Sequence, residues 1–313
     1  MIVVTATTEL LGEIPYVPAT LTRSFRSDRL TKWHVFAALG MGLLGVLATW
    51  DAWHDIYTLA YNDEEYSHIF LVPIVALAMV YVRRMRMRHC RPSGAIVGVM
   101  LVGLGWAMSS HGFYHARQAM WHLGAVVVVL GCMLSVLGKN VLFRFLPAAA
   151  VLIFLVPVPG RIRQAIALPL QQWTAQTAQT GLEICGVETE VSGNTLSING
   201  RPVTVAEACN GMRMVFPLLL VSYAFCYALP LRQSVRFLML LVSPLIAIFC
   251  NVLRTMPTIW LYGNASRAIA DAFHNWSGWA MYLVSLVLLL VIIRALKWAM
   301  LPLSRFPLAS QYA

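Results

Sequence analysis

Cys209, Arg254 and His274 are the three residues of this 313-residue chain best placed to do chemistry together. Each lies where a polar stretch meets a long apolar run. A cysteine in the first turn of a helix is favoured as a thiolate, because the unpaired amides of that turn stabilise negative charge. A thiolate attacks carbonyl carbon, arginine stabilises an oxyanion, and histidine transfers protons near neutral pH. The three residue types together suit nucleophilic acyl transfer.

Cys209 has two other interpretations from position alone. It could form a disulfide with Cys185, since outer compartments are often oxidising, or it could be a small buried apolar residue. Its neighbours favour reactivity: Glu207 and Arg213 bring charge to the edge of an apolar run, and Asn210 begins a tight entry into the helix. These neighbours favour Cys209 as a nucleophile. A disulfide with Cys185 is the remaining alternative.

Arg254 lies near the end of an apolar run, within Asn251-Val-Leu-Arg254. A cation at the centre of a membrane helix costs about 3 kcal/mol on insertion scales, so it usually faces a polar cavity and a partner. The simplest alternatives are a snorkelling side chain or an ion pair with Asp271 or Glu207. Asn251 precedes Arg254 by three residues and shares its helix face. The functional interpretation is a fixed positive charge beside an oxyanion or a thiolate.

His274 follows in the next polar stretch, immediately before the last apolar run. Alone, a histidine at such a boundary is more often a satisfied polar residue than a catalyst. With a cysteine and an arginine at equivalent boundaries, its neutral pKa suits it to take a proton from a thiol and return it to a leaving amine. Asn275 or Asp271 could orient the ring.

The composition of the chain indicates the kind of structure in which Cys209, Arg254 and His274 lie. Hydrophobic residues make up 59% of the chain and charged residues only 12%, about half the charged share of a soluble domain. The sequence therefore predicts an all-α polytopic membrane protein. Runs of nearly 20 apolar residues mark about eight transmembrane helices, at 33–50, 66–82, 95–110, 119–137, 143–159, 213–230, 237–260 and 276–293. The fifth contains Pro147, Pro157 and Pro159, so a kinked or re-entrant segment is the alternative there.

Charge distribution predicts the orientation. With both termini cytoplasmic, the inner segments hold most of the 23 basic residues and the outer segments most of the 13 acids, as the positive-inside rule requires. The net charge of +10 is explained by basic residues that orient the protein in the membrane, so no nucleic-acid partner is expected. The expected division is a cytoplasmic tail at 1–32, one transmembrane catalytic domain at 33–298 and a cytoplasmic tail at 299–313. Cys209, Arg254 and His274 then lie at the extracytoplasmic ends of the sixth, seventh and eighth spans.

The outer segment 160–208 is long enough for structure of its own. Its first part, 161–182, has the pattern of an amphipathic helix that lies along the interface. Its second part alternates polar and apolar residues, with Gly193-Asn194 and Asn199-Gly200 as turn signals, so a small extracytoplasmic β-hairpin or meander is expected before the sixth span. Cys209 follows directly after this element in the sequence.

Other candidate sites are weaker. His111 and His115 are four residues apart, but no acid or cysteine lies close in sequence to complete a metal site. The acids Asp63, Glu64 and Glu65 before His68 favour helix initiation, with substrate or partner contact as the sharper option. Phosphate-binding loops, dinucleotide fingerprints and serine or zinc hydrolase motifs are missing from the sequence. No cofactor and no metal are expected.

Five segments resemble the exosortase/archaeosortase family of multipass membrane proteins. Three carry the chemistry, and the order, spacing and shared outer face of the five make the combination specific. The segments are Tyr66-Ser-His-Ile-Phe-Leu-Val-Pro73, Phe154-Leu-Val-Pro-Val-Pro159, Glu207-Ala-Cys-Asn-Gly-Met-Arg213, Asn251-Val-Leu-Arg254 and His274-Asn-Trp-Ser-Gly278.

The resemblance implies a sortase-like cysteine transpeptidase or protease in the cell (inner) membrane. Its partners would be exported proteins with a C-terminal sorting motif, a hydrophobic span and a basic tail, together with membrane lipids and an envelope lipid or glycan acceptor. Matching positions make Cys209 the nucleophile, Arg254 the oxyanion or thiolate stabiliser and His274 the general acid/base. Asn210 stands where many relatives are expected to have serine, which marks a subgroup or a different sorting motif.

A noncatalytic protein is the alternative from another class. In a transporter or a polysaccharide-export component, Arg254 and Glu207 would line a pathway. Such a pathway should continue toward the inner face, and apart from Asn251 the last three apolar runs offer few polar residues of that kind.

Overall fold

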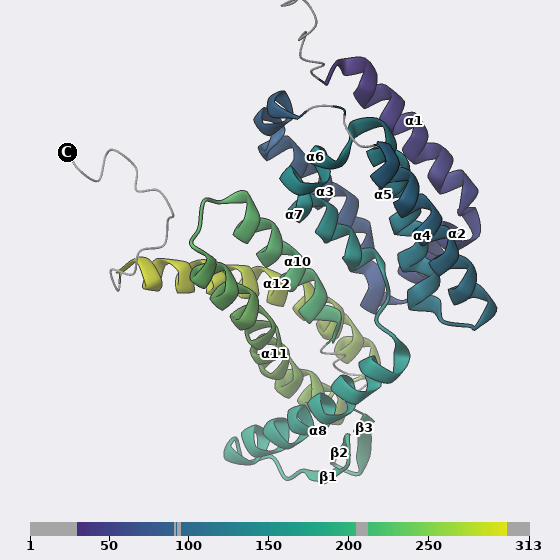
Figure 1. The fold of residues 1–313 in the computed structure, drawn as a ribbon. Coiled ribbons are helices and arrows are strands. Elements are labelled where there is room, and N and C mark those ends of the chain that lie inside the picture. Colours follow the sequence, from purple (N-terminus) through teal and green to yellow (C-terminus); the bar gives the residue numbers. More distant parts are fainter. Residues whose placement is uncertain (1–29, 91, 93–94, 205–211, 299–313) are drawn as a thin grey trace, which may run out of the picture.

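The computed structural model describes residues 30–90, 92, 95–204 and 212–298, which are mostly helical (Figure 1). The expected tails at 1–32 and 299–313 lie almost entirely outside these residues. The described chain forms two helical groups, the first from its N-terminal half and the second from its C-terminal half. Helix α8 and a small sheet lie at one end of the second group.

The first group is built from α-helices joined by short 3-10 helices. In chain order its elements are α1 Lys32–Ala48, α2 Trp50–Asn62, η2 Glu64–Phe70, α3 Leu71–Val82, η3 Arg84–His89, α4 Ala95–Tyr114, α5 Gln118–Leu137, α6 Lys139–Arg144, α7 Leu146–Ala150 and η4 Val151–Leu155.

The second group contains the longest helices and the strands. Its elements are α8 Gly160–Ile184, β1 Glu190–Ser192, β2 Thr195–Ile198, β3 Arg201–Thr204, α10 Met212–Ala228, α11 Gln233–Asn264 and α12 Arg267–Trp298.

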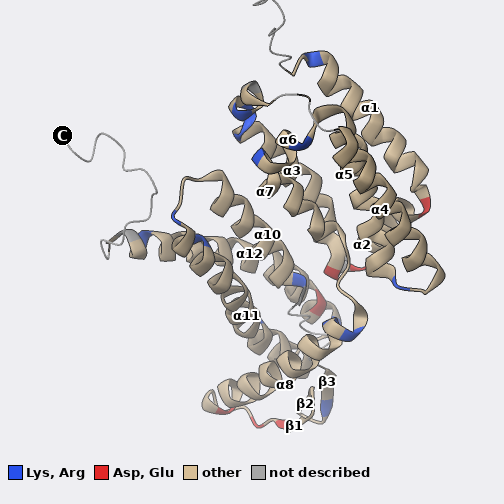
Figure 2. Cartoon of the chain, viewed as in Figure 1, with Lys and Arg blue, Asp and Glu red and all other residues tan. Residues whose placement is uncertain are grey.

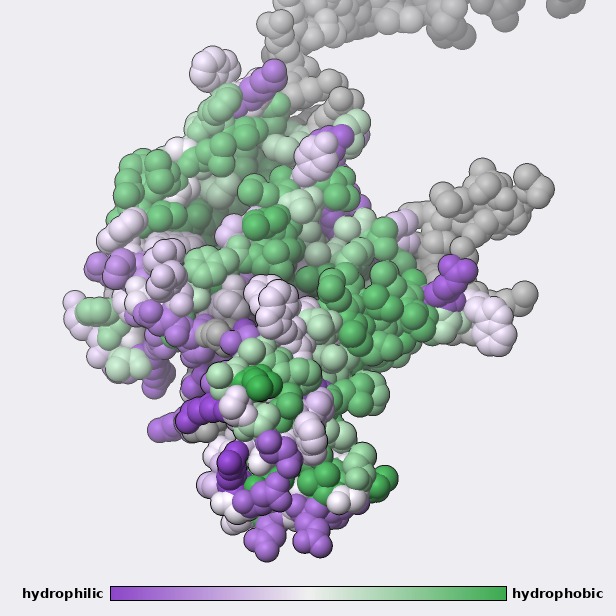
Figure 3. Space-filling view, turned by 180° about the vertical axis from the view of Figure 1, so that it is seen from behind, coloured by the Kyte–Doolittle hydropathy of each residue, from purple (hydrophilic) through white to green (hydrophobic). Residues whose placement is uncertain are grey.

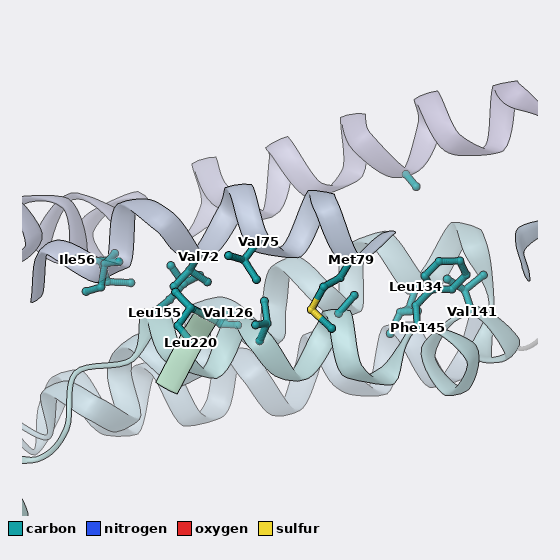
Figure 4. Packing of buried hydrophobic residues seen from close by; sticks show 14 of the residues in the cluster. Ile56, Val72, Val75, Met79, Val126, Leu134, Val141, Phe145, Leu155 and Leu220 are labelled. Atoms are coloured by element: carbon teal, nitrogen blue, oxygen red, sulfur yellow. The ribbon is translucent and has the colours of Figure 1, made fainter. Parts of the chain in front are cut away.

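One hydrophobic core joins the two groups. Figure 4 shows Val72, Val75 and Met79 of α3 packed against Val126 of α5 and Leu220 of α10. Leu220 is fully buried although it belongs to the second group. Helix α10 also contacts η2 and α3 directly. The helix that follows the Cys209 segment is therefore anchored in the core of the first group.

Helices α4 and α5 approach each other at glycines spaced seven residues apart. Gly98, Gly105 and Gly112 of α4 face Gly124 and Gly131 of α5, so the two backbones come into direct contact. A methyl group on Gly105 would lie 2.7 Å from the Val128 nitrogen and 2.8 Å from the Gly124 oxygen. This close approach is possible only without side chains, as in other membrane helix pairs with small residues.

Substitution Gly105→Ala is expected to destabilise the protein. The added methyl group meets backbone atoms that cannot move aside, and overpacking of this kind costs about 1–3 kcal/mol. Gly103→Ala, on the same helix with no atom within 4 Å, is the matched control. Thermal unfolding in detergent should give a lower Tm for Gly105→Ala only; equal Tm values for the two variants would contradict the close packing.

The surface has the character of a membrane protein. Five helices are long and apolar enough to cross a membrane, and up to seven spans result if each of two bent helix pairs counts as one, by length and composition within the described residues. Figure 3 shows broad apolar surface over the helices and polar surface gathered at the end that carries the strands. Large apolar side chains such as Leu77, Met100 and Leu283 point outward. The fold is that of a polytopic helical membrane protein.

The count of eight spans that the sequence predicts is not confirmed: the residues that the structure describes hold five to seven candidate spans. Bends fall at the ends of the first and fifth expected spans: α1 and α2 meet at 82°, and the 146–155 helical segment meets α8 at 80°. The sixth expected span, 213–230, corresponds to the apolar helix α10, of which 17 residues are described. The 80° bend agrees with the kink that Pro157 and Pro159 favour in the fifth expected span, whereas the sequence did not predict the 82° bend.

The segment between α8 and α10 contains a three-stranded antiparallel sheet in the order β1-β2-β3, one strand more than a single hairpin. Two-residue turns join the strands at Gly193-Asn194 and Asn199-Gly200. Asn199 and Gly200 have φ values of 55° and 74°, as the tight turns that suit twisted strands require. Leu196 and Ile198 are fully buried and pack with Ile259 of α11. The sheet is thereby fixed to the end of α11.

Candidate active site

Arg254 lies on α11, with its side chain buried against α12. Only 2% of the residue is exposed. A methyl group built on Gly278 would lie 2.9 Å from Nη1 of Arg254, so the guanidinium group rests against the backbone of α12 at this glycine. His274 lies one turn before Gly278, and residues four apart share a helix face. The structure therefore brings Arg254 to the face of α12 that carries His274.

Asn251 and Arg254 share one buried face of α11, as their spacing predicts. Asn251 is also 2% exposed. The hydroxyl groups of Thr255 and Thr258 donate to the carbonyl oxygens of Asn251 and Arg254, both at 2.7 Å. These bonds satisfy the threonine hydroxyls inside the apolar helix. A polar strip thus continues from Asn251 to Thr258 along the side of α11 that faces the bundle.

His274 is half-buried and lines a polar cavity of about 640 Å³. The cavity lies between β3, the end of α11 and the start of α12. Its lining residues are Arg201, Pro202, Val203, Tyr262, Ala265, Arg267, Asp271, His274 and Asn275. The candidate proton-transfer residue therefore faces a space large enough for part of a peptide.

Asp271 was expected either to orient His274 or to pair with Arg254. In the structure it accepts a hydrogen bond from the Tyr262 hydroxyl at 2.6 Å. Asn275, the other expected orienting residue, lines the same cavity as His274. The hydroxyl of Ser277 donates to the His274 carbonyl oxygen at 3.1 Å and so contacts only the backbone of that residue.

Cys209 lies outside the described residues, as do Glu207 and Asn210. The described residues on both sides of the 205–211 segment belong to the same site. Val203, six residues before Cys209, lines the His274 cavity. On the other side, the carbonyl oxygen of Arg213 accepts a hydrogen bond from Tyr282 of α12 at 3.0 Å. The described residues on both sides of 205–211 thus lie next to α12.

Cys185, the other cysteine of the expected outer segment, ends α8. It is exposed and its thiol is free.

Two of the acids before His68, Asp63 and Glu65, have structural partners. Asp63 accepts the backbone N–H of Glu65 at 2.9 Å, which begins η2 as an initiating acid should. Glu65 accepts a hydrogen bond from Nη1 of Arg163 at 2.6 Å. His68 is buried and stacks on Phe216 of α10 at 5.2 Å between ring centroids. The acids thus tie α8 to η2, and His68 packs against α10.

The sequence did not predict two side-chain contacts between a basic residue and a carboxylate. Besides Arg163 with Glu65, His122 of α5 lies 2.9 Å from the Asp55 carboxylate, which also accepts from Gln118 at 2.8 Å. The partners are far apart in the sequence, so no local spacing reveals them. The one usable signal is the presence of a histidine inside an apolar run, which usually has a polar partner. His111 and His115, the weak metal candidate, stack on each other with centroids 4.0 Å apart.

An apolar groove of about 880 Å³ begins next to the site. Its walls are η2 with α3 on one side and α12 on the other, and α10 forms its floor. Trp276, Trp279 and Leu283 line the α12 side, and Phe70 and Ile74 the opposite side. Trp276 is two residues from His274. A membrane-embedded apolar segment in this groove would therefore end close to the polar cavity.

Charges differ between the regions of the protein (Figure 2). Basic residues gather at η3, α6 and the connection between α10 and α11, whereas the acids lie near α2, η2 and the sheet. Arg254 and His274 lie toward the ends of α11 and α12 that meet the sheet. The site thus lies in the part of the protein that holds the acids.

Substitution Gly278→Ala is expected to lower activity with little effect on stability. The methyl group would lie 2.9 Å from Nη1 of Arg254, closer than the roughly 3.5 Å of an ordinary contact, so the guanidinium must shift. For the oxyanion-stabilising role that the sequence predicts for Arg254, a shift of a few tenths of an ångström should reduce kcat about tenfold. The measurement is the rate of substrate cleavage beside the Tm. Gly40→Ala, with no atom within 4 Å, is the control; a Gly278→Ala enzyme of full activity would show that the position of Arg254 is unimportant.

Comparison with known proteins identifies the family. The family described as transmembrane exosortases matches residues 53–291, which is more than half of the chain and includes Cys209, Arg254 and His274. No curated protein and no solved structure matches significantly. The chain therefore belongs to the transmembrane exosortase family.

Proposed function

We propose that this protein is a membrane-embedded cysteine transpeptidase or peptidase. It cleaves the C-terminal sorting tail of exported proteins on the extracytoplasmic face of the cell membrane. Family membership supports a membrane-embedded sorting activity. The observation that carries the residue assignment is the meeting of Arg254 and the His274 face at Gly278, beside a cavity from which β3 leads toward Cys209.

The proposed reaction has two steps. The Cys209 thiolate attacks the carbonyl carbon of the scissile peptide bond, and Arg254 stabilises the oxyanion. The C–N bond then breaks, His274 protonates the departing amine, and the body of the substrate remains as a thioester on Cys209. Water, or an amine or hydroxyl group of an envelope lipid or glycan, attacks the thioester and restores the thiolate. Hydrolysis gives a free acid, and transfer gives a conjugate.

The groove and the charge pattern support a membrane-anchored substrate. A tail with a hydrophobic span can lie beside α12 in the apolar groove, with its scissile bond near His274. A basic cluster after that span would remain on the cytoplasmic side, as the positive-inside rule requires. Both termini of this protein would also be cytoplasmic.

Coexpression tests the proposal. The protein is produced together with exported proteins that carry a C-terminal sorting motif, a hydrophobic span and a basic tail, and the new C-termini are identified by mass spectrometry. We expect one defined cleavage site before the hydrophobic span. The mass at that terminus distinguishes a free acid from a conjugate. Intact tails in every coexpressed substrate would contradict the proposal and favour the noncatalytic alternative of a transporter or polysaccharide-export component.

A further inference from the structure

Arginines from the two helical groups meet at the end of the bundle away from the sheet (Figure 2). Arg83 follows α3 in the first group, and its Nη2 donates to the carbonyl oxygen of Tyr227 in α10. Arg236 of α11 places its guanidinium 5.0 Å from the centre of the Tyr227 ring. Tyr227 therefore holds one arginine from each group, and the three residues Arg83, Tyr227 and Arg236 are called the arginine junction below.

The arginine junction gathers like charges without an acid to balance them. Burial and the nearby positive charges of Arg86 and Arg236 lower the pKa of Arg83. None of the acids in the described chain belongs to α3, η3, α6, α7, α10 or α11. At the other end of the bundle, by contrast, Arg163 joins α8 to η2 through the carboxylate of Glu65. A negative group from outside the described chain would complete the junction in the way that Glu65 completes that contact.

Arg236 has a hydrogen-bond donor that the described protein does not use. Its Nε is buried and has no hydrogen-bond partner among the described residues, while its Nη2 donates to the Leu229 carbonyl oxygen at 3.3 Å. A buried donor without a partner is unfavourable and often marks the place of a missing ligand or water. The planar edge of a guanidinium matches two oxygens of one phosphate or carboxylate group. The arginine junction therefore suits an oxyanion.

The surface beside the junction is apolar, which indicates that the oxyanion belongs to a lipid. Val82 precedes Arg83 and is exposed. Leu229, whose carbonyl oxygen accepts from Arg236, and Phe237, which follows Arg236, are exposed as well. At the end of a membrane helix, such apolar side chains contact acyl chains and the neighbouring arginines contact lipid phosphates. An anionic phospholipid provides both partners, whereas a soluble anion provides only the phosphate.

We propose that the arginine junction binds the phosphate headgroup of an anionic phospholipid and that the bound lipid joins the two helical groups. Arg83 and Arg236 bind the phosphate from opposite groups, and the acyl chains lie against Leu229 and Phe237. The junction lies at the opposite end of the bundle from the sheet and His274. It is therefore separate from the proposed active site, and the assignment does not depend on the proposed function.

The test is a comparison of three ligands on the full-length protein in a neutral detergent. Phosphatidylglycerol is the anionic lipid, phosphatidylcholine has the same phosphate with its charge cancelled by choline, and glycerol 3-phosphate has the phosphate without acyl chains. Native mass spectrometry measures the amount of each ligand bound, and thermal unfolding measures the Tm.

We expect a Kd for phosphatidylglycerol about tenfold or more below that for phosphatidylcholine, the usual effect of a hydrogen bond to a charged group. Bound phosphatidylglycerol should also raise the Tm, because a ligand that binds only the folded state stabilises it. Glycerol 3-phosphate should bind at least about tenfold more weakly than phosphatidylglycerol, since it buries no acyl chain. Equal Kd values for the two lipids would overturn the inference. Glycerol 3-phosphate that binds as tightly as phosphatidylglycerol would also overturn it, because the site would then hold a soluble anion.

Substitutions locate the site. Arg83→Gln and Arg236→Gln keep an N–H donor for the carbonyl oxygens of Tyr227 and Leu229 but remove the charge, so each should raise the Kd for phosphatidylglycerol about tenfold. The matched control is Arg294→Gln, which removes one charge from an exposed residue of α12 and should leave the Kd unchanged. An equal rise in all three variants would show that only the total charge matters and would contradict the assignment.

Arg236→Lys keeps the test decisive if Arg83→Gln does not fold. Lysine retains the charge without the planar fork, so its Kd for phosphatidylglycerol should lie between those of the wild type and Arg236→Gln. A Kd that is unchanged in both Arg236 variants would exclude the arginine junction as the lipid site. None of these measurements requires cleavage of a substrate, so the result stands whether or not the proposed function is correct.

Discussion

Replacement of Cys209 by alanine is expected to abolish tail cleavage, with a fall in kcat of at least about 10³-fold. Without the thiol there is no group to form the thioester, and the remaining Arg254 and His274 provide only residual catalysis of water attack. Cys209→Ser should be almost as inactive, because a serine hydroxyl is much less acidic than a thiol and forms no stable anion near neutral pH. The measurement is the amount of new C-terminus formed per molecule of folded enzyme.

Cys185→Ala is the matched control for Cys209→Ala. Cys185 is exposed at the end of α8 and its thiol is free in the structure. Its replacement should leave cleavage unchanged if no bridge to Cys209 is required. Normal cleavage by correctly folded Cys209→Ala protein would exclude the proposed mechanism, and loss of cleavage in Cys185→Ala would favour the bridge.

Replacement of Arg254 by methionine is expected to reduce kcat by about 10²–10³-fold, the usual effect of removing one oxyanion-stabilising group. Methionine has a similar length and no charge, so it fills the buried space between α11 and α12. Arg254 is buried and interacts with neighbouring groups, and removing one partner of a buried charged interaction destabilises a protein, so a lower Tm is expected as well. The expected result is therefore a lower kcat per molecule of folded protein, measured beside the Tm.

Arg254→Lys and Arg163→Gln complete this experiment. Lysine keeps the positive charge but loses the planar fork, so partial activity is expected. Arg163→Gln removes the contact with Glu65 and should affect Tm more than kcat. If the loss of activity in Arg254→Met follows a loss of folded protein, and Arg254→Lys behaves in the same way, Arg254 is structural and its catalytic role is wrong.

Much of the helical architecture follows from the sequence, because apolar runs and turn residues act locally. The runs at 95–110 and 119–137 lie within α4 and α5, and those at 237–260 and 276–293 lie within α11 and α12. The membership in the exosortase family, inferred from short motifs, is confirmed by the match over residues 53–291. These features depend on residues close to one another in the chain.

Features that depend on distant partners were not predicted. The 82° bend between α1 and α2 falls at Thr49, where the first expected span ends, and the sequence gave no sign that a helix continues beyond it at an angle. The contact of Arg163 with Glu65 joins residues 98 positions apart. Gly278 was part of a recognised motif, but only the structure shows that its missing side chain makes room for Arg254. The arginines of the His274 cavity likewise come together only when β3 packs beside α12.

The proposed roles of Arg254 and His274 remain predictions in the same sense as that of Cys209. The structure supplies their surroundings: a buried guanidinium against α12, and a half-buried imidazole in a polar cavity beside an apolar groove. A transport pathway would need polar groups along the whole bundle. The site instead gathers its charge at one end, beside the sheet, as a reaction at the membrane surface requires.

The central claim is that the substrate body is carried on Cys209 as a thioester. The most direct measurement is mass spectrometry of the Cys209 peptide from protein coexpressed with a tailed substrate and quenched in acid. The claim predicts a mass increase equal to the substrate residues that end at the new C-terminus, removable by hydroxylamine. An unmodified Cys209 peptide, together with undiminished cleavage by Cys209→Ala protein, would contradict it.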